Sequence, residues 1–528
     1  MKPLSLQQEN IAHFVRHGRG SFIVVARAGT GKTFTIVNGI VHVIYYEQPR
    51  ASVAVMAYNN SAGAELNERL TKAGLTNWKQ IKAGTCHSFG FGAFRKAYPD
   101  VKVDKDKLKK IIAELAAQSL HVGLDYRSSM FISCKGVIEK TVSLAKQRAI
   151  GFMCAIGDRR AWYDLIEHHG LEDDLAEGYT VDQLVEVSIP VLQRSFDTDQ
   201  FVIDFDDMIL APLVHKVRFW QYDYVIMDEA QDTNPARRAL AMAMLKPRYG
   251  RFGAVGDDRQ AIYGFTGADS DSLELIKKAT NATMLPLTVT YRCPKAVVAM
   301  ARVLVPDYQA HPDAPEGVVR EVPYEVVNGD NVRYWYENEN LGYGDAILCR
   351  NTKPLVEEAY ALLRAGIGCM VEGREIGNSL VNLATRWKRI KQLSALAEKL
   401  VEHEDRERTK WLAKGQEEKA DAVSDRVGTL TALISKLSKD GKTMVTELVD
   451  FIGSLFGDSE DADKKVVRLC TLHRSKGREW RRVFHIGRTK YLPSGYAKKP
   501  HQLLQEENLE YVGFTRAMEE YVEVVLEA

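Results

Sequence analysis

The stretch ARAGTGKT, residues 26–33, is the one around which the rest of the chain is interpreted. It follows the apolar run FIVV (22–25) and precedes FTIV (34–37), which predicts a buried strand that turns into a helix. At such a turn, Gly29 and Gly31 let the backbone point N–H groups at an anion, and Lys32 adds a point charge. The stretch therefore predicts a phosphate-binding loop, with the hydroxyl of Thr33 placed for Mg²⁺.

The loop departs from the strict GxxxxGK[ST] pattern, because Ala26 stands where the first glycine would be. On these residues alone, a glycine turn that connects a strand to a helix and binds nothing stays open as the alternative. Partner residues elsewhere in the chain have to decide between the two.

Length and composition set wide limits. The chain has 528 residues, enough for about three or four domains at roughly 150 residues each. Its 45% hydrophobic and 27% charged residues are those of an ordinary soluble globular protein. No apolar run is long enough to cross a bilayer, and Met1–His13 reads as the start of a polar helix rather than a secretory leader. We expect a cytoplasmic protein without a membrane partner.

The cysteine pattern and the net charge limit which metal sites and which kinds of nucleic-acid contact the chain can have. The seven cysteines contain no CxxC pair, which favours free thiols in a reducing cytosol over a zinc or iron–sulfur site. The formal net charge is +1, so a nucleic-acid partner would have to be held by a local basic or aromatic track.

The first part of the chain alternates between strand-like and helix-like segments. Leu4–Glu9 opens an amphipathic helix that Ser5 is placed to cap, and the helix leads into the strand before the loop. A second apolar strand, Ser52–Ala57, is followed by a helix over Ala62–Leu70. This alternation predicts a parallel α/β sheet, whose ligands gather at the carboxyl ends of the strands. The segment Gly84–Phe89 lies at another such end.

Helical segments such as Lys107–Ser119 and Ile138–Arg148 replace this pattern between about Phe89 and Phe196. We interpret them as a helical insertion within the first α/β domain. The α/β pattern resumes with the strands Tyr222–Met227 and Phe252–Asp257.

A second α/β block starts near Leu285 and is interrupted between about Leu383 and Lys464 by a charged, strand-poor stretch. Two apolar stripes with helical spacing lie there on either side of Gly415. At under three heptads, they favour an antiparallel helical hairpin over a dimerising coiled coil. The stripes are Trp387, Ile390, Leu393, Leu396 and Leu400, then Ala420, Val423, Val427, Leu430, Ile434 and Leu437. The other segments expected in this block are Ala346–Cys349, Pro354–Arg364, Ile367–Val371, Val466–Thr471, Val483–Ile486 and Tyr521–Leu526.

The pair Asp228-Glu229 ends an apolar strand and complements the phosphate loop. The aspartate is placed to hold Mg²⁺ together with Thr33, and the glutamate to accept a proton from the water that attacks a γ-phosphate. Two solvated carboxylates at a strand end are the alternative, which the upstream loop disfavours.

The segment VGDDRQAIYGF (255–265) adds Gln260 as a γ-phosphate sensor and two rings close to it, Tyr263 and Phe265. A base that stacks on such rings would be linked to the phosphate state of the nucleotide. Two aromatic core residues are the alternative.

Taken in order, these motifs resemble the UvrD/Rep/PcrA branch of superfamily 1 DNA helicases, and the resemblance covers nearly the whole chain. LSLQQ (4–8) resembles the Q motif, ARAGTGKT the Walker A motif, AYNNSAGAEL (57–66) motif Ia, GTCHSF (84–89) motif Ib and MDEAQDTN (227–234) the Walker B motif. VGDDRQAIYGFTGA (255–268) resembles motif III, TYRC (290–293) motif IV, VRLCTLHRSKGREW (467–480) motif V and EYVGFTRA (510–517) motif VI.

The resemblance implies an α/β protein with two RecA-like parallel-sheet motor domains, each with a mainly helical insertion. Domain 1A would comprise residues 1–88 and 197–284, with insertion 1B at 89–196. Domain 2A would comprise residues 285–382 and 465–528, with a reduced insertion 2B at 383–464.

The resemblance also implies roles for single residues. ATP and Mg²⁺ would lie in a cleft that closes between the domains, with Arg292 and Arg516 as arginines at the γ-phosphate. The catalytic residues would be Lys32, Glu229, Gln260, Arg292 and Arg516, and the metal ligands Thr33 and Asp228. The nucleotide-binding residues would be Gln8 and Tyr291 at adenine, Ala28, Gly29, Thr30, Gly31, Lys32 and Thr33 at the phosphates, Glu479 at the ribose, and both arginines. The DNA-binding residues would be Tyr58, Asn60, Thr85, His87, Tyr263, Phe265, Thr471 and His473.

Three features depart from the family pattern. Phe265-Thr266 replaces a frequent Trp-Arg, so we expect weaker strand binding there. Arg478 stands where the family usually has leucine; a solvated arginine is favoured over an added phosphate or nucleotide contact. The insertion at 383–464 is short for 2B, and we expect no appended nuclease or interaction tail after motif VI.

The leading functional prediction is an ATP-dependent translocase on single-stranded DNA and a helicase, moving 3′ to 5′ by resemblance, with tailed duplexes as substrates. The second is a motor that clears proteins from DNA or needs a partner protein to unwind. A nucleotide-switched binding module is the third, and it leaves the two arginines and the polar track unexplained. We expect a monomer or weak self-association.

Overall fold

The computed structural model describes residues 3–75, 80–122, 126–197, 202–262, 271–328, 331–365, 367–412, 417–457, 466–495, 497–498 and 500–526. The chain divides into two compact units, and each is described by itself. The first unit consists of Met1–Arg27 and Gly31–Leu287, and the second of Ala28–Thr30 and Thr288–Ala528.

The first unit is built on a six-stranded sheet in which every pairing is parallel. Successive residues of its strands face opposite sides: Phe22 and Val24 pack with α1 and α4, whereas Ile23 packs with helices α5, α11 and α12. Helices cover both faces of such a sheet, which is why its strands read as continuous apolar runs. Its order is β3 (Ile81–Thr85), β2 (Val53–Ala57), β6 (Tyr224–Met227), β7 (Arg251–Gly256), β1 (Phe22–Ala26) and β8 (Thr283–Leu287).

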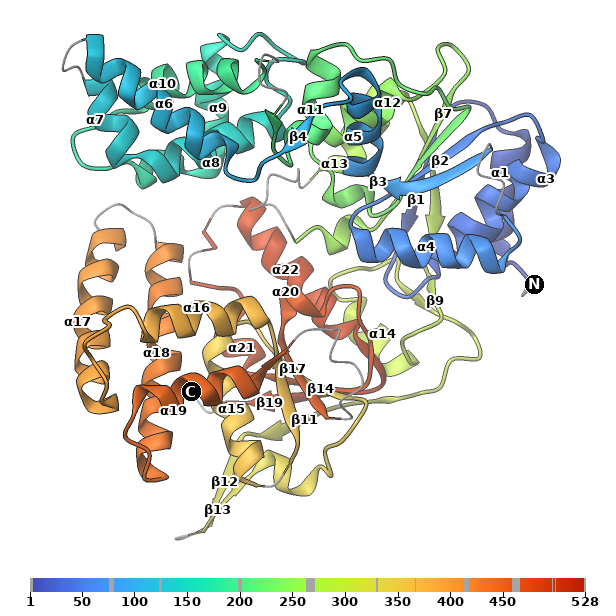
Figure 1. Cartoon of the computed structure of the whole chain (residues 1–528). Helices are drawn as coiled ribbons and strands as arrows, with labels where there is room; N and C mark the ends of the chain where they lie inside the picture. Colours follow the sequence, from blue (N-terminus) through green and yellow to red (C-terminus); the bar gives the residue numbers. More distant parts are fainter. Residues whose placement is uncertain are drawn as a thin grey trace. The chain divides into compact units, whose positions relative to one another are not determined.

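The helices of this unit follow the strands as the sequence predicts. Those around the sheet are α1 (Leu6–His17), α2 (Lys32–Phe34), the π-helix η1 (Thr35–Val41), α3 (His42–Glu47), α4 (Asn60–Lys72), α5 (Cys86–Ala97), α11 (Asp207–Val214), α12 (Pro235–Ala243) and α13 (Ser272–Thr280). A separate group of helices, drawn in shades from blue to green in Figure 1, consists of α6 (Lys107–Val122), α7 (Tyr126–Ser133), α8 (Lys135–Gln147), α9 (Arg159–His169) and α10 (Val181–Ser195).

Buried charges anchor this helical group. Lys146 of α8 is fully buried and lies 2.7 Å from Asp207 and 2.5 Å from Asp204. Lys107 of α6 reaches the same Asp207 at 2.6 Å. Removing one partner of a buried pair leaves an uncompensated charge, so these contacts fix where α6 and α8 lie on α11. The short strands β4 (Lys102–Val103) and β5 (Val202–Ile203) pair beside them.

The second unit carries a seven-stranded sheet that is also parallel in every pairing. Its order is β11 (Val318–Pro323), β19 (Ala517–Val525), β18 (Trp480–Ile486), β14 (Asp345–Cys349), β17 (Val467–Thr471), β15 (Cys369–Glu372) and β16 (Phe456–Gly457). The remaining strands are β9 (Val289–Thr290) with β10 (Gln309–Ala310), and β12 (Glu325–Asn328) with β13 (Asn331–Tyr334). Its helices are α14 (Lys295–Ala301), α15 (Thr352–Arg364), α16 (Arg374–Ala384), α17 (Leu393–Leu412), α18 (Glu417–Lys439), α19 (Val445–Leu455), α20 (Leu472–Ser475), α21 (Arg488–Tyr491) and α22 (Pro500–Phe514). The predicted fold class, α/β with RecA-like parallel-sheet domains and helical insertions, is confirmed.

The two predicted apolar stripes form a hairpin of α17 and α18 that lie side by side (Figure 1). Trp387 and Ile390, predicted in the first stripe, instead lie in the turn before α17. Leu396 and Leu400 of α17 and Val427 and Leu430 of α18 are buried in the same hydrophobic cluster as strands β14 and β17. The stripes are therefore used within one chain, as the hairpin prediction requires.

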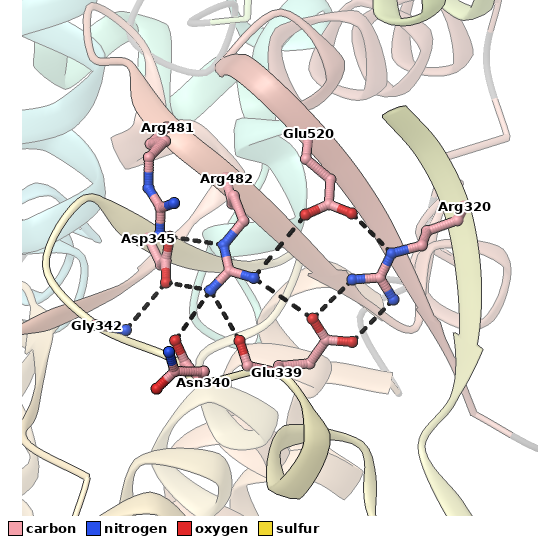
Figure 2. A network of polar contacts seen from close by, with 8 residues as sticks. All are labelled: Arg320, Glu339, Asn340, Gly342, Asp345, Arg481, Arg482 and Glu520. Carbon is pink, nitrogen blue, oxygen red and sulfur yellow. Dashed lines mark hydrogen bonds and ion pairs between the residues drawn. The ribbon is translucent and has the colours of Figure 1, made fainter. Parts of the chain in front are cut away.

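A network of charges ties four strands of the second sheet together (Figure 2). Asp345, fully buried at the start of β14, accepts from Arg482 at 2.7 Å and 3.0 Å and from Arg481 at 3.0 Å. Arg320 of β11 binds Glu339 through two hydrogen bonds of 2.7 Å and 2.8 Å and Glu520 of β19 at 2.7 Å. Such paired, forked hydrogen bonds are the geometry in which arginine binds carboxylates most strongly.

A single buried carboxyl holds the β11–β12 turn against α15. Glu358 accepts hydrogen bonds from the Tyr324 hydroxyl at 2.9 Å and from Trp335 Nε1 at 3.0 Å. Burial raises the pKa of Glu358 to about 7, against the lowering effect of both donors and of Lys436.

Candidate functional site

The glycines of the predicted phosphate loop hold conformations that other residues adopt at a cost. Gly29 has φ +69° and Gly31 has φ +83°, both in the left-handed region. A Cβ atom on Gly29 would lie 2.5 Å from both the Arg292 Cβ and the Thr290 Oγ1. The backbone conformation and the lack of space for a Cβ atom therefore both favour glycine at position 29 over any other residue.

Gln8 lies beside this loop. Its side chain completes a capping box with Ser5, and its Nε2 donates to Thr35 Oγ1 at 3.1 Å. The Thr35 hydroxyl donates in turn to the carbonyl oxygen of Gly31 at 3.0 Å. The amide predicted to read adenine is thus fixed to the helix that begins at the loop.

Lys32, Asp228 and Glu229 come together at the carboxyl ends of β1 and β6. Lys32 Nζ lies 2.7 Å from Glu229 Oε1. Burial lowers the pKa of Lys32, but Glu229, Asp257 and Asp228 outweigh it, so the pKa is raised overall. Burial, with Glu229 beside it, raises the pKa of Asp228 to about 7. Glu229 also has φ +48°, a left-handed conformation that is rare for such residues and often found at functional sites.

Gln260 is buried in the same unit and donates to Asp257 Oδ2 at 2.7 Å. Arg27, inside the loop, donates to Asp257 Oδ1 at 3.0 Å and to Asp258 at 2.6 Å. Sequence reasoning missed Arg27 and Asp257. The signal was available, since both follow apolar strands that pair in the sheet.

Residues 28–30 of the loop belong to the second unit by their contacts. The backbone N–H of Ala28 donates to the Tyr511 hydroxyl at 3.0 Å, and the Tyr308 hydroxyl donates to the Ala28 carbonyl at 3.0 Å. The two rings meet edge to face with centroids 5.6 Å apart. Neither tyrosine was predicted as a site residue.

Arg292 and Glu479 are brought together in this unit. Arg292 Nε donates to Glu479 Oε2 at 2.6 Å, and its Nη1 to the Thr515 carbonyl at 3.2 Å. Arg516 is buried and donates to the carbonyls of Val512 and Arg478 at 2.8 Å and 3.0 Å. Burial, with Arg292 close by, lowers the pKa of Arg516 to about 10.

The predicted adenine-stacking ring, Tyr291, is half exposed and lies against His311 with ring centroids 5.0 Å apart. His311 was not predicted, because nothing in its local sequence marks it.

Two predicted DNA-binding residues line one pocket of the first unit. Tyr58 and His87 face a cavity of about 180 Å³ together with Arg237, Lys146 and Asp206. The Arg237 guanidinium lies 4.9 Å from the centre of the Tyr58 ring. Burial and Arg237 lower the pKa of His87 to about 4.

Thr85 and Asn60 of the first unit are not among the residues that line this pocket. Thr85 is buried and its hydroxyl accepts from Ser88 N at 3.2 Å, so it caps α5, whereas Asn60 is exposed at the start of α4. Thr471 precedes α20 in the second unit, and burial next to Arg350 lowers the pKa of His473 to about 3. Tyr263 and Phe265 lie outside the described residues. Arg478 makes an ion pair with Glu372, rather than standing free in solvent.

The residues around the loop fit a nucleotide with Mg²⁺. The left-handed glycines leave room for a phosphate beside the backbone, Lys32 would supply the cation, and Asp228 and the half-buried Thr33 would supply oxygen ligands. Among the described residues, no group of three or more His, Cys, Asp or Glu could hold a metal ion by itself.

All seven cysteines are free thiols. In the described parts of the chain, no helix is long and apolar enough to span a membrane.

Comparison with known proteins identifies relatives. Residues 6–281 match the model of the UvrD/REP helicase N-terminal domain, and residues 198–522 that of the UvrD-like helicase C-terminal domain. The ATP-dependent DNA helicase Rep of Buchnera aphidicola (from Acyrthosiphon pisum) is 26% identical over 57% of this chain and 45% of its own length. Rep of Escherichia coli K12 is 28% identical over 56% of this chain and 42% of its own length. PcrA of Staphylococcus aureus Mu50 is 22% identical over 61% of this chain and 42% of its own length. The matched regions thus span less than half the length of these relatives.

Proposed function

This chain belongs to the UvrD/REP helicase family, and from that premise we propose that it is an ATP-hydrolysing motor that moves along single-stranded DNA and unwinds duplexes. The observation that carries the proposal is the group formed by Lys32, Asp228 and Glu229 at the glycine loop. It combines a phosphate-binding cation, a metal ligand and a base within one unit.

Each of these residues has a distinct role in the proposal. Lys32 binds the β- and γ-phosphates, and its present partner Glu229 then becomes available to accept the proton of the attacking water. Asp228 and Thr33 hold Mg²⁺, which when bound neutralises charge on the phosphates. Gln260 acts as the γ-phosphate sensor, and the Gln8 side chain binds the adenine edge.

Arg292 and Arg516 of the second unit are proposed to act on the γ-phosphate, with Tyr291 at adenine and Glu479 at the ribose. An arginine supplied in this way is worth about 10³–10⁵ in rate. For Arg292, leaving Glu479 is part of that action, because the two are now paired at 2.6 Å.

Strand binding is proposed to use the Tyr58–His87 pocket, with Asn60, Thr85, Thr471 and His473 along the same strand and Tyr263 and Phe265 as further stacking residues. The pocket supports this assignment because it combines the rings of Tyr58 and His87 with the Arg237 guanidinium.

ATP hydrolysis with and without single-stranded DNA tests the motor. Lys32→Ala should lose ATP binding, whereas Glu229→Gln should keep binding and hydrolyse very slowly. Absence of stimulation by DNA would refute the motor and favour a nucleotide-switched binding module.

Strand displacement on duplexes with a 3′ or a 5′ tail tests direction and unwinding. We propose movement from 3′ to 5′, so the 3′-tailed duplex should be opened. DNA-stimulated hydrolysis without displacement would support the second candidate, a motor that clears proteins or needs a protein partner. A specific observation favours keeping it: the hairpin of α17 and α18, where a larger 2B insertion is expected, is packed into the core of its own unit.

We further propose that the protein acts in the cytosol, as a monomer or a weakly associating protein.

A further inference from the structure

The loops that precede four neighbouring strands of the first sheet form a surface that the proposed function leaves unused. The strands β2, β6, β7 and β1 are adjacent, and Val53, Tyr224 and Arg251 lie in register at their beginnings. Since these strands are parallel, their preceding loops lie at one edge of the sheet, opposite the carboxyl ends with the nucleotide loop and the Tyr58 pocket. We call the surface of residues 18–21, 48–52, 215–223 and 244–250 the basic edge.

The basic edge has a strong excess of positive charge in a nearly neutral chain. Asp223 is the single carboxylate in these four loops, and Lys246 already pairs with it at 2.8 Å. Glu47, just before one loop, is held by Arg16 at 2.5 Å. In the described part of the chain, the remaining cations of the basic edge are exposed and form no ion pair; they are Arg19, Arg50, Lys216, Arg218 and Arg248.

Two large aromatic rings stand among these cations. Trp220 is 67% exposed and Tyr249 is 66% exposed, which is unusual for rings that bury well. Backbone hydrogen bonds join the two loops: Tyr222 N donates to the Met244 carbonyl at 2.8 Å, and Lys246 N donates to the Tyr222 carbonyl at 2.9 Å. The rings are therefore presented by neighbouring loops with fixed backbones.

The backbone at this surface favours residues other than those present. Lys216 has φ +51° and Arg248 has φ +73°, left-handed conformations that glycine adopts without strain. Both positions nevertheless carry a cation. Strain of this kind persists where the rest of the structure enforces it, and it clusters at binding sites.

We propose that the basic edge binds single-stranded nucleic acid, as a second strand site separate from the one beside the nucleotide loop. Its cations contact phosphates, and unpaired bases stack on Trp220 and Tyr249. Four neighbouring strands at about 4.8 Å spacing place the loops across roughly 14 Å, enough for a few nucleotides. The two ends of a five-residue β-strand are about 16 Å apart. A nucleic-acid strand bound at the basic edge therefore leaves the pocket of Tyr58 open.

The chemistry favours a nucleic acid over an acidic protein segment. Cations spread over four loops match a backbone with evenly spaced charges, and flat exposed rings offer a stacking surface that carboxylate side chains do not use. A duplex keeps its bases inside the stack, so it would engage the cations but not Trp220 and Tyr249.

Photo-crosslinking on the full chain tests the proposal. The probe is an oligothymidylate of about eight nucleotides with one 5-iododeoxyuridine, and cross-linked peptides are identified by mass spectrometry. We expect adducts on Trp220 or Tyr249 in addition to those near Tyr58, and a second binding event in a titration. Trp220→Ala with Tyr249→Ala should abolish those adducts and weaken the second event by at least about fivefold, while DNA-stimulated ATP hydrolysis persists.

Charge variants separate binding from folding. Arg218→Ala with Arg248→Ala should reduce the salt dependence of the second event by about 1.4 in the log–log slope, if each cation releases one phosphate's counterions. Arg248→Gly should weaken the second event yet keep or raise the melting temperature, because glycine relieves the left-handed strain at φ +73°. The matched control is Arg160→Ala with Lys135→Ala, which removes the same charge from exposed helix positions outside the basic edge and should leave the second event unchanged.

Several outcomes would overturn the proposal. These are saturation by one oligonucleotide per chain without adducts in residues 215–223 or 244–250, equal adduct formation with a blunt duplex, and equal competition by an oligoglutamate of the same charge. The last would assign the basic edge to an acidic protein segment. If the chain did not hydrolyse ATP, only the proposed motor function would be refuted. The proposed second site would still be tested, because a cross-link shows directly which residues the oligonucleotide contacts.

Discussion

Replacing Glu358 by glutamine should change how stability depends on pH. In the folded chain the pKa of Glu358 is raised to about 7, chiefly by burial, from an ordinary value of 4.5. The folded state therefore holds this proton more tightly than the unfolded state, so its contribution to the free energy of unfolding is complete below about pH 4.5. That contribution is lost as the pH rises towards 7.

The size of the effect follows from the shift. A difference of about 2.5 in pKa corresponds to about 3 kcal/mol in total, of which 2 to 3 kcal/mol falls between pH 5 and pH 8. A glutamine at position 358 does not titrate and still offers an oxygen to Trp335 Nε1 and an N–H to the Tyr324 oxygen. The variant should therefore be less sensitive to alkaline pH than the parent.

Urea unfolding at several pH values between 5 and 8 measures this, with hydrogen exchange of α15 as the local readout. Subtracting the parent from Glu358→Gln cancels every other titrating group. The difference should rise with pH by about 2 to 3 kcal/mol. A flat difference, or one that falls with pH, would refute the assignment of a neutral, buried carboxyl.

Three other perturbations have clear expected outcomes. Asp345→Asn should lower the free energy of unfolding by about 1.5–3 kcal/mol because Arg482 loses charge-assisted hydrogen bonds at 2.7 Å and 3.0 Å, while Arg481→Ala, at a half-exposed position, should cost about 1 kcal/mol or less in the same melting experiment. Gly29→Ala should abolish ATP binding in a titration, since its Cβ would meet atoms at 2.5 Å. Gly20→Ala, with φ +77° and open space, should bind ATP normally. Glu229→Gln should trap bound ATP, and a turnover equal to that of the parent would show that another group takes the proton.

The strands and the glycine turn after β1 could be predicted because their signals are local. Buried parallel strands such as β2 are continuous apolar runs, and a glycine turn between strand and helix has few uses. Strand ends were less accurate: β18 starts at Trp480 rather than Val483, and β19 at Ala517 rather than Tyr521, because sheet pairing extends them through charged residues.

Most of the candidate site depends on contacts that no local pattern reports. Tyr308 and Tyr511 reach Ala28 from more than two hundred residues away, so sequence spacing carries no trace of that arrangement. His311 likewise gains its meaning only from the Tyr291 ring beside it. The catalytic and DNA-binding roles of the predicted residues stay predictions that the variants above test.

The assignment of Ala28–Thr30 to the second unit limits how this protein can be divided. A fragment ending at Leu287 would keep Lys32 and Glu229 but would lose Tyr308 and Tyr511, which hydrogen-bond the peptide groups of Ala28. Exchanging the C-terminal half for that of a relative would replace part of the loop's support along with the sheet. Truncation after Leu287 would therefore remove the two side chains that hydrogen-bond the backbone of Ala28, and we expect this part of the predicted phosphate loop to lose its fixed conformation.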